Sequence, residues 1–185
     1  MGSPVQRKSG LSRERAERAV SGGTIDEHRG LQKFMTCFLE TFMVDGLLDP
    51  RLRELVVLRI GWLCEQPYEW GSHYRVANGL GVSDDDVLAV RTGPTDPRFG
   101  PTEQALLTAA DEIMELGRIT EETYGRCRTA LGDSEVLALE LLYLATGYRM
   151  IASILSTNEL SLTEAGLELW PPDGVGPEAR STPNG

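Results

Sequence analysis

The sequence predicts an all-α protein, a single helical bundle of about six to eight helices. Apolar residues recur at intervals close to 3.6 positions in nearly every segment between the two ends, which is the period of an amphipathic helix. Alternating runs of β-branched residues, which are typical of strands, are absent. With 185 residues, the chain is long enough for one hydrophobic core but not for two independent ones. One domain is therefore expected.

The expected helices follow one another with short connections. They cover residues 11–20, 26–44, 50–64, 67–78, 83–91, 102–116, 121–131 and 133–158. Pro50 and Pro67 stand at first helical positions, where proline breaks no hydrogen bond, and Ser83 precedes three acidic residues as an N-cap. The helix at 50–64 is apolar nearly all round, which is typical of a helix buried on most sides. We expect it to form the centre of the fold.

The two ends of the chain are expected to lie outside this bundle. Residues 1–10 and 171–185 are rich in Pro, Gly and charged residues, and such segments cannot bury enough apolar surface to become ordered. The folded domain is then residues 11–170. No apolar stretch of the kind found in secretory signals follows the basic residues at the start, which favours a cytoplasmic location.

Charge and cysteine spacing narrow the classes of function. The formal net charge is −10, which argues against nucleic acid as a partner because phosphate backbones are bound by clustered Lys and Arg. No run approaches the roughly 18 apolar residues of a membrane span, so we expect no membrane contact. Cys37, Cys64 and Cys127 are far apart among apolar neighbours, which favours reduced core thiols. The sequence contains no CxxC pair, no Cys/His cluster and no GxGxxG motif, so neither a metal nor a cofactor is expected.

A glutamate and a histidine stand four residues apart in "CEQPYEWGSH", residues 64–73. On a helix Glu69 and His73 share one face, and a carboxylate beside an imidazole can fix its tautomer and raise its pKa, as a general base requires. If Pro67 is the first helical position, Glu69 is the third, where exposed N–H groups stabilise an anion. The same facts also fit an ordinary capping arrangement at the start of a buried helix.

Glu54 favours a functional site over an ordinary capping arrangement. It lies in the middle of the most apolar helix, where an unpaired carboxylate would cost several kcal/mol, on the order of the penalty for burying any unpaired charge. Some group must therefore satisfy it. The candidates are Arg51, Arg53, Arg59, a partner chain and His73.

The segment "RLRELVVLRIGWLCEQPYEWGSHYRVANGLGVSDDDVLAV" resembles the central helices of the carboxymuconolactone decarboxylase and alkylhydroperoxidase D (AhpD) superfamily, and the resemblance extends over about residues 28–162. The peroxidase branch of that superfamily has a Glu, a CxxC pair beginning twelve residues later, and a His four residues after the second Cys. These positions fall on Glu54, Gln66, Glu69 and His73. The spacing is kept, but both thiols are missing.

The resemblance implies an AhpD-like bundle and acid–base chemistry without thiols. A thiol peroxidase needs a thiolate and a resolving thiol, so peroxidase activity is not expected. The first hypothesis is a cofactor-free lyase or isomerase of the decarboxylase type, acting on a small organic acid, lactone or cyclic biosynthetic intermediate. His73 would move the proton, and Glu69 and Glu54 would orient and tune it. The alternatives are a thiol-independent oxidoreductase or accessory biosynthetic enzyme, and a non-catalytic oligomeric binding protein.

Five further residues are candidates for contact with a substrate: Gln66, Tyr68, Trp70, Tyr148 and Arg149. Large aromatic residues beside a buried helix also occur in a core or at a subunit interface. An arginine in so apolar a helix needs an anion, and Glu54, Glu140 or a neighbouring subunit competes with a substrate carboxylate for Arg149. The superfamily forms trimers, hexamers or related rings with active sites near subunit contacts, so the resemblance implies a homo-oligomer (trimer, hexamer or dimer-based).

Overall fold

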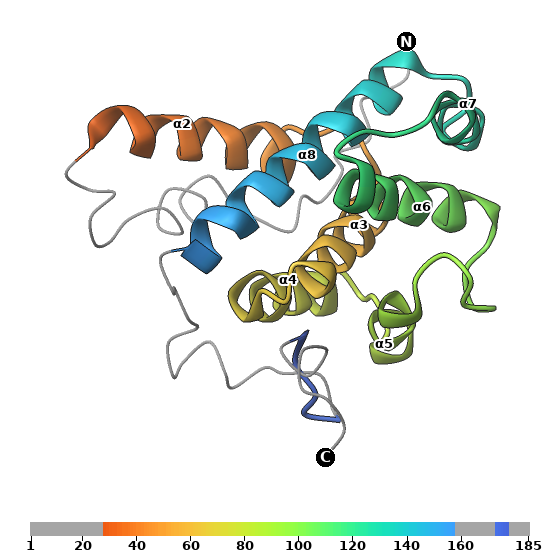
Figure 1. Ribbon diagram of the computed structural model, residues 1–185, viewed down its shortest axis with the longest axis horizontal. Helices are drawn as coiled ribbons and strands as arrows, with labels where there is room; N and C mark the ends of the chain where they lie inside the picture. Colours follow the sequence, from red (N-terminus) through yellow and green to blue (C-terminus); the bar gives the residue numbers. More distant parts are fainter. Residues whose placement is uncertain (1–27, 158–172, 178–185) are drawn as a thin grey trace, which may run out of the picture.

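The helix predicted to be central, α3 (Pro50–Leu63), does lie at the centre of the structure. The computed structural model describes residues 28–157 and 173–177. Ten of the 14 residues of α3 are buried, and the helix packs against α4, α5, α6 and α8 (Figure 1). A helix with neighbours on so many sides has no polar face, which explains its apolar sequence.

The described residues are all-helical, so the predicted fold class is confirmed. They contain seven α-helices and one π-helical turn: α2 (Arg29–Leu39), η2 (Glu40–Val44), α3 (Pro50–Leu63), α4 (Pro67–Gly79), α5 (Asp84–Thr92), α6 (Pro101–Leu116), α7 (Glu121–Ala130) and α8 (Glu135–Thr157). The predicted helix at 26–44 is divided into α2 and η2. The helix predicted at 11–20 and the predicted disordered residues 1–10 lie outside the described residues.

Polar residues that precede the helices fix where they begin. Asp49 accepts hydrogen bonds from the first N–H groups of α3, Gln66 from Tyr68 in α4, and Ser83 from Asp86 in α5. Each side chain satisfies a donor that the helix itself leaves free. These local signals account for the agreement between the predicted and observed helix starts.

The apolar core has two parts, one on each side of α3. The first lies between α3, α6 and α8 and includes Val56, Val57, Ile60, Leu106, Ile113 and Leu144. The second lies between α3, α4 and α5 and includes Leu55, Leu58, Trp62, Trp70, Val87 and Val90. Because α3 contributes to both parts, its position relative to α4 and α8 decides how side chains from these three helices meet.

Gly61 allows α4 to lie unusually close to α3. A β-carbon at this position would stand 3.2 Å from the Glu69 β-carbon and 3.2 Å from the Trp70 amide nitrogen. Glycine therefore provides the space in which the first turns of α4 rest on the end of α3. This contact brings Glu69 and His73 over the buried face of α3.

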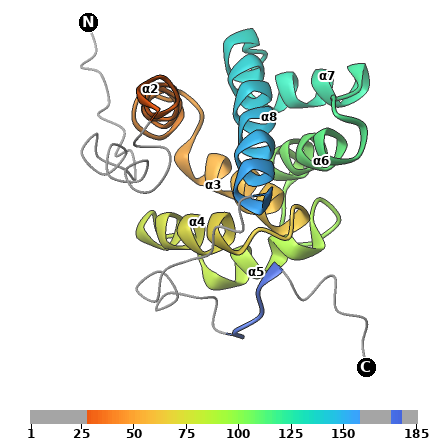
Figure 2. The same cartoon turned by 60° about the vertical axis from the view of Figure 1, so that its left-hand side comes forward.

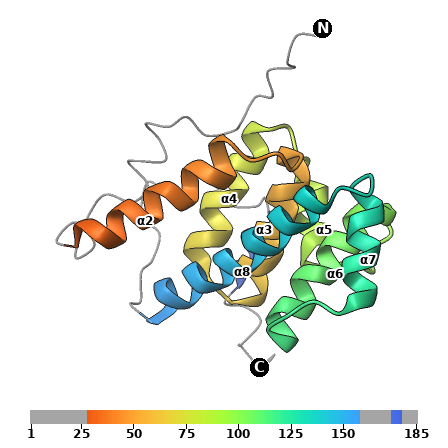
Figure 3. The same cartoon turned by 90° about the horizontal axis from the view of Figure 1, so that it is seen from above.

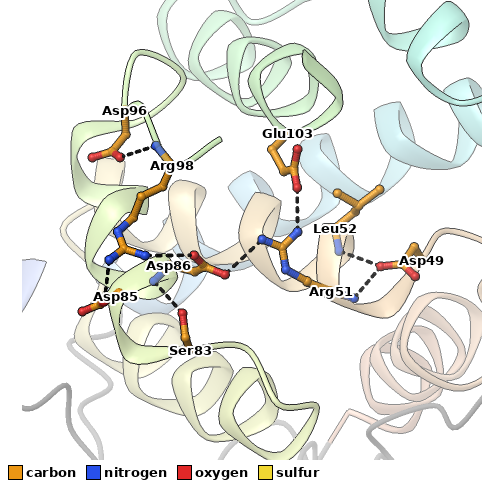
Figure 4. Close-up of polar contacts among 9 residues, drawn as sticks. All are labelled: Asp49, Arg51, Leu52, Ser83, Asp85, Asp86, Asp96, Arg98 and Glu103. Atoms are coloured by element: carbon orange, nitrogen blue, oxygen red, sulfur yellow. Dashed lines mark hydrogen bonds and ion pairs between the residues drawn. The ribbon is translucent and has the colours of Figure 1, made fainter. Parts of the chain in front are cut away.

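A network of ion pairs joins the outer ends of three helices. Arg51 at the start of α3 contacts Asp86 of α5 at 3.0 Å and Glu103 of α6 at 2.7 Å, and Arg98 pairs with Asp85 beside them (Figure 4). The side chain of Arg51 is 37% exposed, and exposed pairs contribute only about 0–1 kcal/mol each. The network aligns these helix ends on the outer surface of the bundle.

Helix α8 is long and apolar enough, by length and composition, to cross a membrane, although no such run was expected from the sequence. It packs against α3, α6 and α7 (Figure 2). Seven of its residues are buried in the protein, and they include Leu141, Leu144, Tyr148 and Ile151. This packing is that of a core helix, which is apolar for the same physical reason as a membrane helix.

Helix α2 stands at the edge of the bundle and has no buried residue. Figures 1 and 3 show it alongside α8, with its N-terminal end extending beyond the other helices. Phe38 contacts α8 at Gly147, where a β-carbon would lie 2.2 Å from the ring. Leu31 and Phe34, near the other end of α2, remain half-exposed.

Part of the predicted disordered tail is packed against the protein. Arg91 donates to both carboxylate oxygens of Asp173 and to the carbonyl of Val175, and its guanidinium lies 4.9 Å from the ring centre of Trp62. Residues 176 and 177 are buried. Charge pairing and stacking on Arg91 thus join residues 173–177, part of the tail expected to be disordered, to the helical domain.

Replacing Gly61 by valine should separate α4 from α3. We expect Gly61→Val to lower the free energy of unfolding by about 1–3 kcal/mol, as overpacking of a core does. Gly125→Val is the matched control, because a β-carbon at Gly125 in α7 meets nothing within 4 Å. Denaturant unfolding measures both. Equal stability of the two variants would show that the close approach of α4 does not depend on Gly61.

Candidate functional site

The buried carboxylate of Glu54 is satisfied from two sides. Its Oε1 accepts from Arg53 Nε at 2.8 Å, and its Oε2 lies 2.7 Å from His73 Nδ1. Glu54 is fully buried. Of the five candidate partners, Arg53 and His73 therefore bind Glu54 together. Arg51 takes part in the outer network, and Arg59 pairs with Asp111 and with the last carbonyls of α5.

His73 stands between two carboxylates. Its Nδ1 must carry the proton shared with Glu54, since a carboxylate can only accept. Its Nε2 lies 3.5 Å from Glu69 Oε2, which is too long for a strong hydrogen bond. His73 is 7% exposed and Glu69 is 5% exposed. One ring nitrogen is thus held firmly, and the other is left available inside an almost closed site.

Tyr148 from α8 forms the third side of the site. Its ring meets the His73 ring edge-on, with 4.9 Å between the centres and 86° between the planes. Phe38 packs on the other side of Tyr148 at 5.5 Å. The Tyr148 hydroxyl donates to Met43 Sδ at 3.2 Å. Burial first, then Glu69 and Glu54, raise the pKa of Tyr148 well above its usual value, so the phenol stays protonated.

The environment raises the pKa of both His73 and Glu69. Burial alone would lower the pKa of His73, but the charge and hydrogen bond of Glu54, followed by the charge of Glu69, raise it above its usual value. Burial, and to a smaller extent the charge of Glu54, raise the pKa of Glu69 to about 6, although His73 opposes the shift. Glu69 can therefore exchange protons near neutral pH beside an imidazole whose protonated form is favoured, an arrangement that suits proton-transfer catalysis.

Gln66 and Tyr68, two of the predicted substrate contacts, lie at the start of α4. The Gln66 side chain caps the helix through its Oε1 and donates from Nε2 to Ser156 of α8 at 3.3 Å. Tyr68 is half-buried, and burial followed by the charge of Glu69 raises the pKa of its hydroxyl. Both residues are on the same side of the molecule as Glu69, and no described contact joins either of them to His73.

Trp70 and Arg149 are directed elsewhere. Trp70 belongs to the core between α3, α4 and α5, where its ring lies 5.2 Å from that of Trp62 and 5.3 Å from the Arg91 guanidinium. Arg149 donates to the carbonyl of Ile113 in the last turn of α6 at 2.8 Å.

Arg149 therefore binds the C-terminal end of α6 instead of the expected anion, because the carbonyls of a helix end carry partial negative charge. Two of the expected partners are engaged elsewhere. Glu54 binds Arg53 and His73, and Glu140 accepts from the amide groups of Leu47 and Leu48.

The sequence predicts Arg53 only as a counter-ion for Glu54, but the structure gives it further contacts in the site. It is 3% exposed. Its Nη1 donates to the carbonyl of Phe42 in η2 at 3.2 Å, while its Nη2 is buried without an acceptor among the described residues. The available signal was its position next to a buried glutamate in an apolar helix. Nothing in the sequence indicated the unpaired donor.

The site has little direct contact with the outside. Two open surface grooves, of about 410 and 450 Å³, lie between α6 and α7 and between η2 and α8. His73, Glu54 and Glu69 line neither of them. Within the described part of the chain, no group of three or more His, Cys, Asp or Glu side chains has an arrangement that could hold a metal ion.

Fold and site together define an all-helical protein with a buried carboxylate–imidazole–carboxylate group. Residues 29–112 match the model of the Carboxymuconolactone decarboxylase family. The match includes Glu54, Glu69 and His73 and ends within α6, short of the span from 28 to 162 over which the resemblance was expected. No curated protein and no solved structure matched the chain.

Ionisation of Glu69 should destabilise the protein as the pH rises. Because its pKa is raised from 4.5 to about 6 in the folded state, its contribution to stability is complete below pH 4.5 and is lost as the pH rises through 6. Between pH 4.5 and 7, Glu69→Gln should therefore gain on the order of 2 kcal/mol in free energy of unfolding relative to the wild type.

Denaturant unfolding across this pH range checks the prediction. Glu103→Gln is the matched control, and its effect on the free energy of unfolding should change with pH in the opposite direction. Burial raises the pKa of Glu103, but the hydrogen bond from Arg51 and other groups outweigh it and lower the pKa. Its contribution is therefore present at neutral pH and lost as the pH falls. A Glu69→Gln difference that does not change with pH would contradict the raised pKa.

Proposed function

We propose that the protein is a cofactor-free, cytoplasmic lyase or isomerase that acts on a small organic acid, lactone or cyclic intermediate. The observation that carries this proposal is the arrangement of His73. Glu54 holds its Nδ1 at 2.7 Å, while the carboxylate of the described residues beside its Nε2 is the more distant Glu69, at 3.5 Å, in a nearly closed site. A charged imidazole with one free N–H is suited to giving a proton to a reaction intermediate.

In the decarboxylation that we propose, the bond between the substrate carbon and its carboxylate breaks, and carbon dioxide leaves. The electron pair of that bond moves into a conjugated carbonyl such as that of a lactone, which gives an enolate. His73 then delivers its Nε2 proton to the carbon, and the carboxyl group of Glu69 returns a proton to Nε2. Glu69 regains its proton from solvent. In total, one proton replaces one molecule of carbon dioxide.

Tyr148 is the best placed of the expected substrate contacts, because it packs against His73 and keeps its hydroxyl proton. Gln66 and Tyr68 border the same helix start. Trp70 and Arg149 have no role in this proposal, since the core between α3 and α5 and the end of α6 occupy them. Gln66 and Glu69 take the positions of the CxxC pair, so the proposed chemistry uses no thiol.

A non-catalytic role has one observation in its favour. His73, Glu54 and Glu69 are almost completely buried, as they would be if they formed a structural pair that fixes α4 on α3. In that case His73 would contribute to stability and to nothing else. Activity and stability must therefore be measured on the same variants.

His73→Gln should remove turnover and leave the fold intact. Carbon dioxide release would be followed with a panel of carboxylated γ-lactones, and the loss should be about 10²–10⁴-fold, the usual contribution of a general acid or base. His28→Gln is the matched control, because His28 is an exposed N-cap of α2. Replacement of Cys37, Cys64 and Cys127 by serine should also leave turnover unchanged. If His73→Gln is as active as the wild type, or if the wild type turns over no lactone and the variant unfolds, the proposal fails.

We also propose that the protein forms a homo-oligomer through an apolar face of α8. Exposed apolar residues follow one side of this helix: Val136, Leu139, Tyr143, Met150 and Ile154. Leu139, Tyr143 and Leu47 line the groove of about 450 Å³ beside η2. Leu31 and Phe34 of the neighbouring α2 are exposed as well. Exposed apolar side chains on neighbouring elements support association of subunits.

Tyr143→Glu should reduce the mass of the particle in solution, because it places a charge in the centre of the apolar face. Leu116→Glu is the matched control, since Leu116 is 54% exposed and belongs to α6 rather than to α8. Sedimentation velocity measures the mass of each protein. A wild type that is monomeric at micromolar concentration, or a Tyr143→Glu variant with unchanged mass, would contradict this interface.

A further inference from the structure

Arg53 has one hydrogen-bond donor that the described chain does not satisfy. Its Nε donates to Glu54 and its Nη1 to the Phe42 carbonyl, and its Nη2 is buried without an acceptor. An unpaired buried donor costs about 1–3 kcal/mol, and a charged one more. A buried charged donor left free in this way indicates a position where an atom of a ligand or an ordered water is held.

The Tyr148 hydroxyl is a second donor with a weak partner. It donates to Met43 Sδ, and a thioether is a poor acceptor. Met43 lies next to Phe42 in η2, so the same turn contacts both Tyr148 and Arg53. Turns with π-helical geometry are frequent at functional sites. The positive charge of Arg53 also acts on His73 and Tyr148, where it works against the rise in both pKa values.

The charges of the site favour the binding of one anion. With Glu69 protonated, Arg53 and His73 carry two positive charges and Glu54 carries one negative charge. The groups around Arg53 and His73 are Glu54 from α3, Glu69 from α4 and Tyr148 from α8, while η2 contributes the apolar Phe42 and Met43. The buried group therefore has a net charge of +1 until Glu69 ionises, and a buried net charge favours binding of a counter-ion.

We propose that Arg53 Nη2 and the Tyr148 hydroxyl bind a carboxylate group of the substrate beside His73. This assignment rests on the proposed function and identifies the anionic group that the site takes. The carboxylate accepts from the guanidinium and from the phenol, which replaces a missing and a weak hydrogen bond by two charge-assisted ones. It thereby fixes the rest of the substrate next to the Nε2 proton of His73. Arg53 is then a substrate-binding residue as well as the counter-ion of Glu54.

The test uses difluoroacetate, a small carboxylate that stays ionised at all relevant pH values, with binding to the full chain followed by fluorine NMR. At pH 5.5 the wild type should bind it saturably. The affinity should fall at least tenfold by pH 7.5, because Glu69 ionises and the net positive charge is lost. Difluoroacetamide, the neutral analogue, should bind at least tenfold more weakly than difluoroacetate at pH 5.5.

Arg53→Lys should weaken binding at least tenfold, because lysine keeps the charge but lacks the planar second nitrogen. Arg51→Lys is the matched control on the same helix and should bind as the wild type does. Tyr148→Phe provides a second variant that leaves Arg53 and Glu54 paired, and it should also bind more weakly.

No saturable binding by the wild type at pH 5.5 would overturn the assignment and leave an ordered water as the occupant. Equal binding of the neutral amide, or unchanged binding by Tyr148→Phe and a folded Arg53→Lys, would overturn it as well. Loss of turnover in His73→Gln without difluoroacetate binding would retain the proposed function and reject only this anion site. Difluoroacetate binding by a protein that turns over no lactone would retain the anion site and reject the proposed function.

Discussion

The structure depends on how one buried carboxylate is neutralised. Glu54 is fully buried in the central helix and is bound by Arg53 from its own helix and by His73 from α4. Removing one partner of a buried pair costs about 3–5 kcal/mol, because the other charge is left alone. The pairing therefore fixes the rotation of α4 on α3 and places His73 between Glu54 and Glu69.

The same pairing gives His73 its chemical character. A buried imidazole by itself would be neutral, but the two carboxylates keep its pKa above the usual value. The pKa of Glu69 is raised as well, because burial and the nearby charge of Glu54 favour its protonated form. His73 and Glu69 therefore both hold a proton more firmly than the free side chains do. An enzyme that transfers protons near neutral pH needs such a pair, whereas a merely structural ion pair does not.

The sequence was sufficient for the parts of the structure that depend on local signals. Pro50, Pro67 and Ser83 marked helix starts that the structure confirms, and the apolar sequence of α3 identified the central helix. Glu54 was recognised as requiring a partner, but the sequence left five possibilities open. The choice among them depends on the close approach of α4 at Gly61, which is a tertiary contact.

Other features could not be predicted because their partners are backbone groups or distant segments. Arg149 binds a carbonyl at the end of α6, 36 residues away, and no side-chain pattern records such a contact. Trp70 turns towards Trp62 and Arg91 because of how α5 packs. The ordering of residues 173–177 depends on Arg91 in the same way.

The most direct test of this account is an NMR titration of the His73 ring in the wild type, Glu54→Gln and Glu69→Gln. The chain has only two histidines, so His28→Gln assigns the signals. The account predicts a wild-type pKa above 6.5 that falls in both variants, with the larger fall in Glu54→Gln because Glu54 both carries a charge and accepts the Nδ1 hydrogen bond. A His73 that titrates at 6.5 or below and does not respond to either substitution would contradict the coupling on which the proposed chemistry rests.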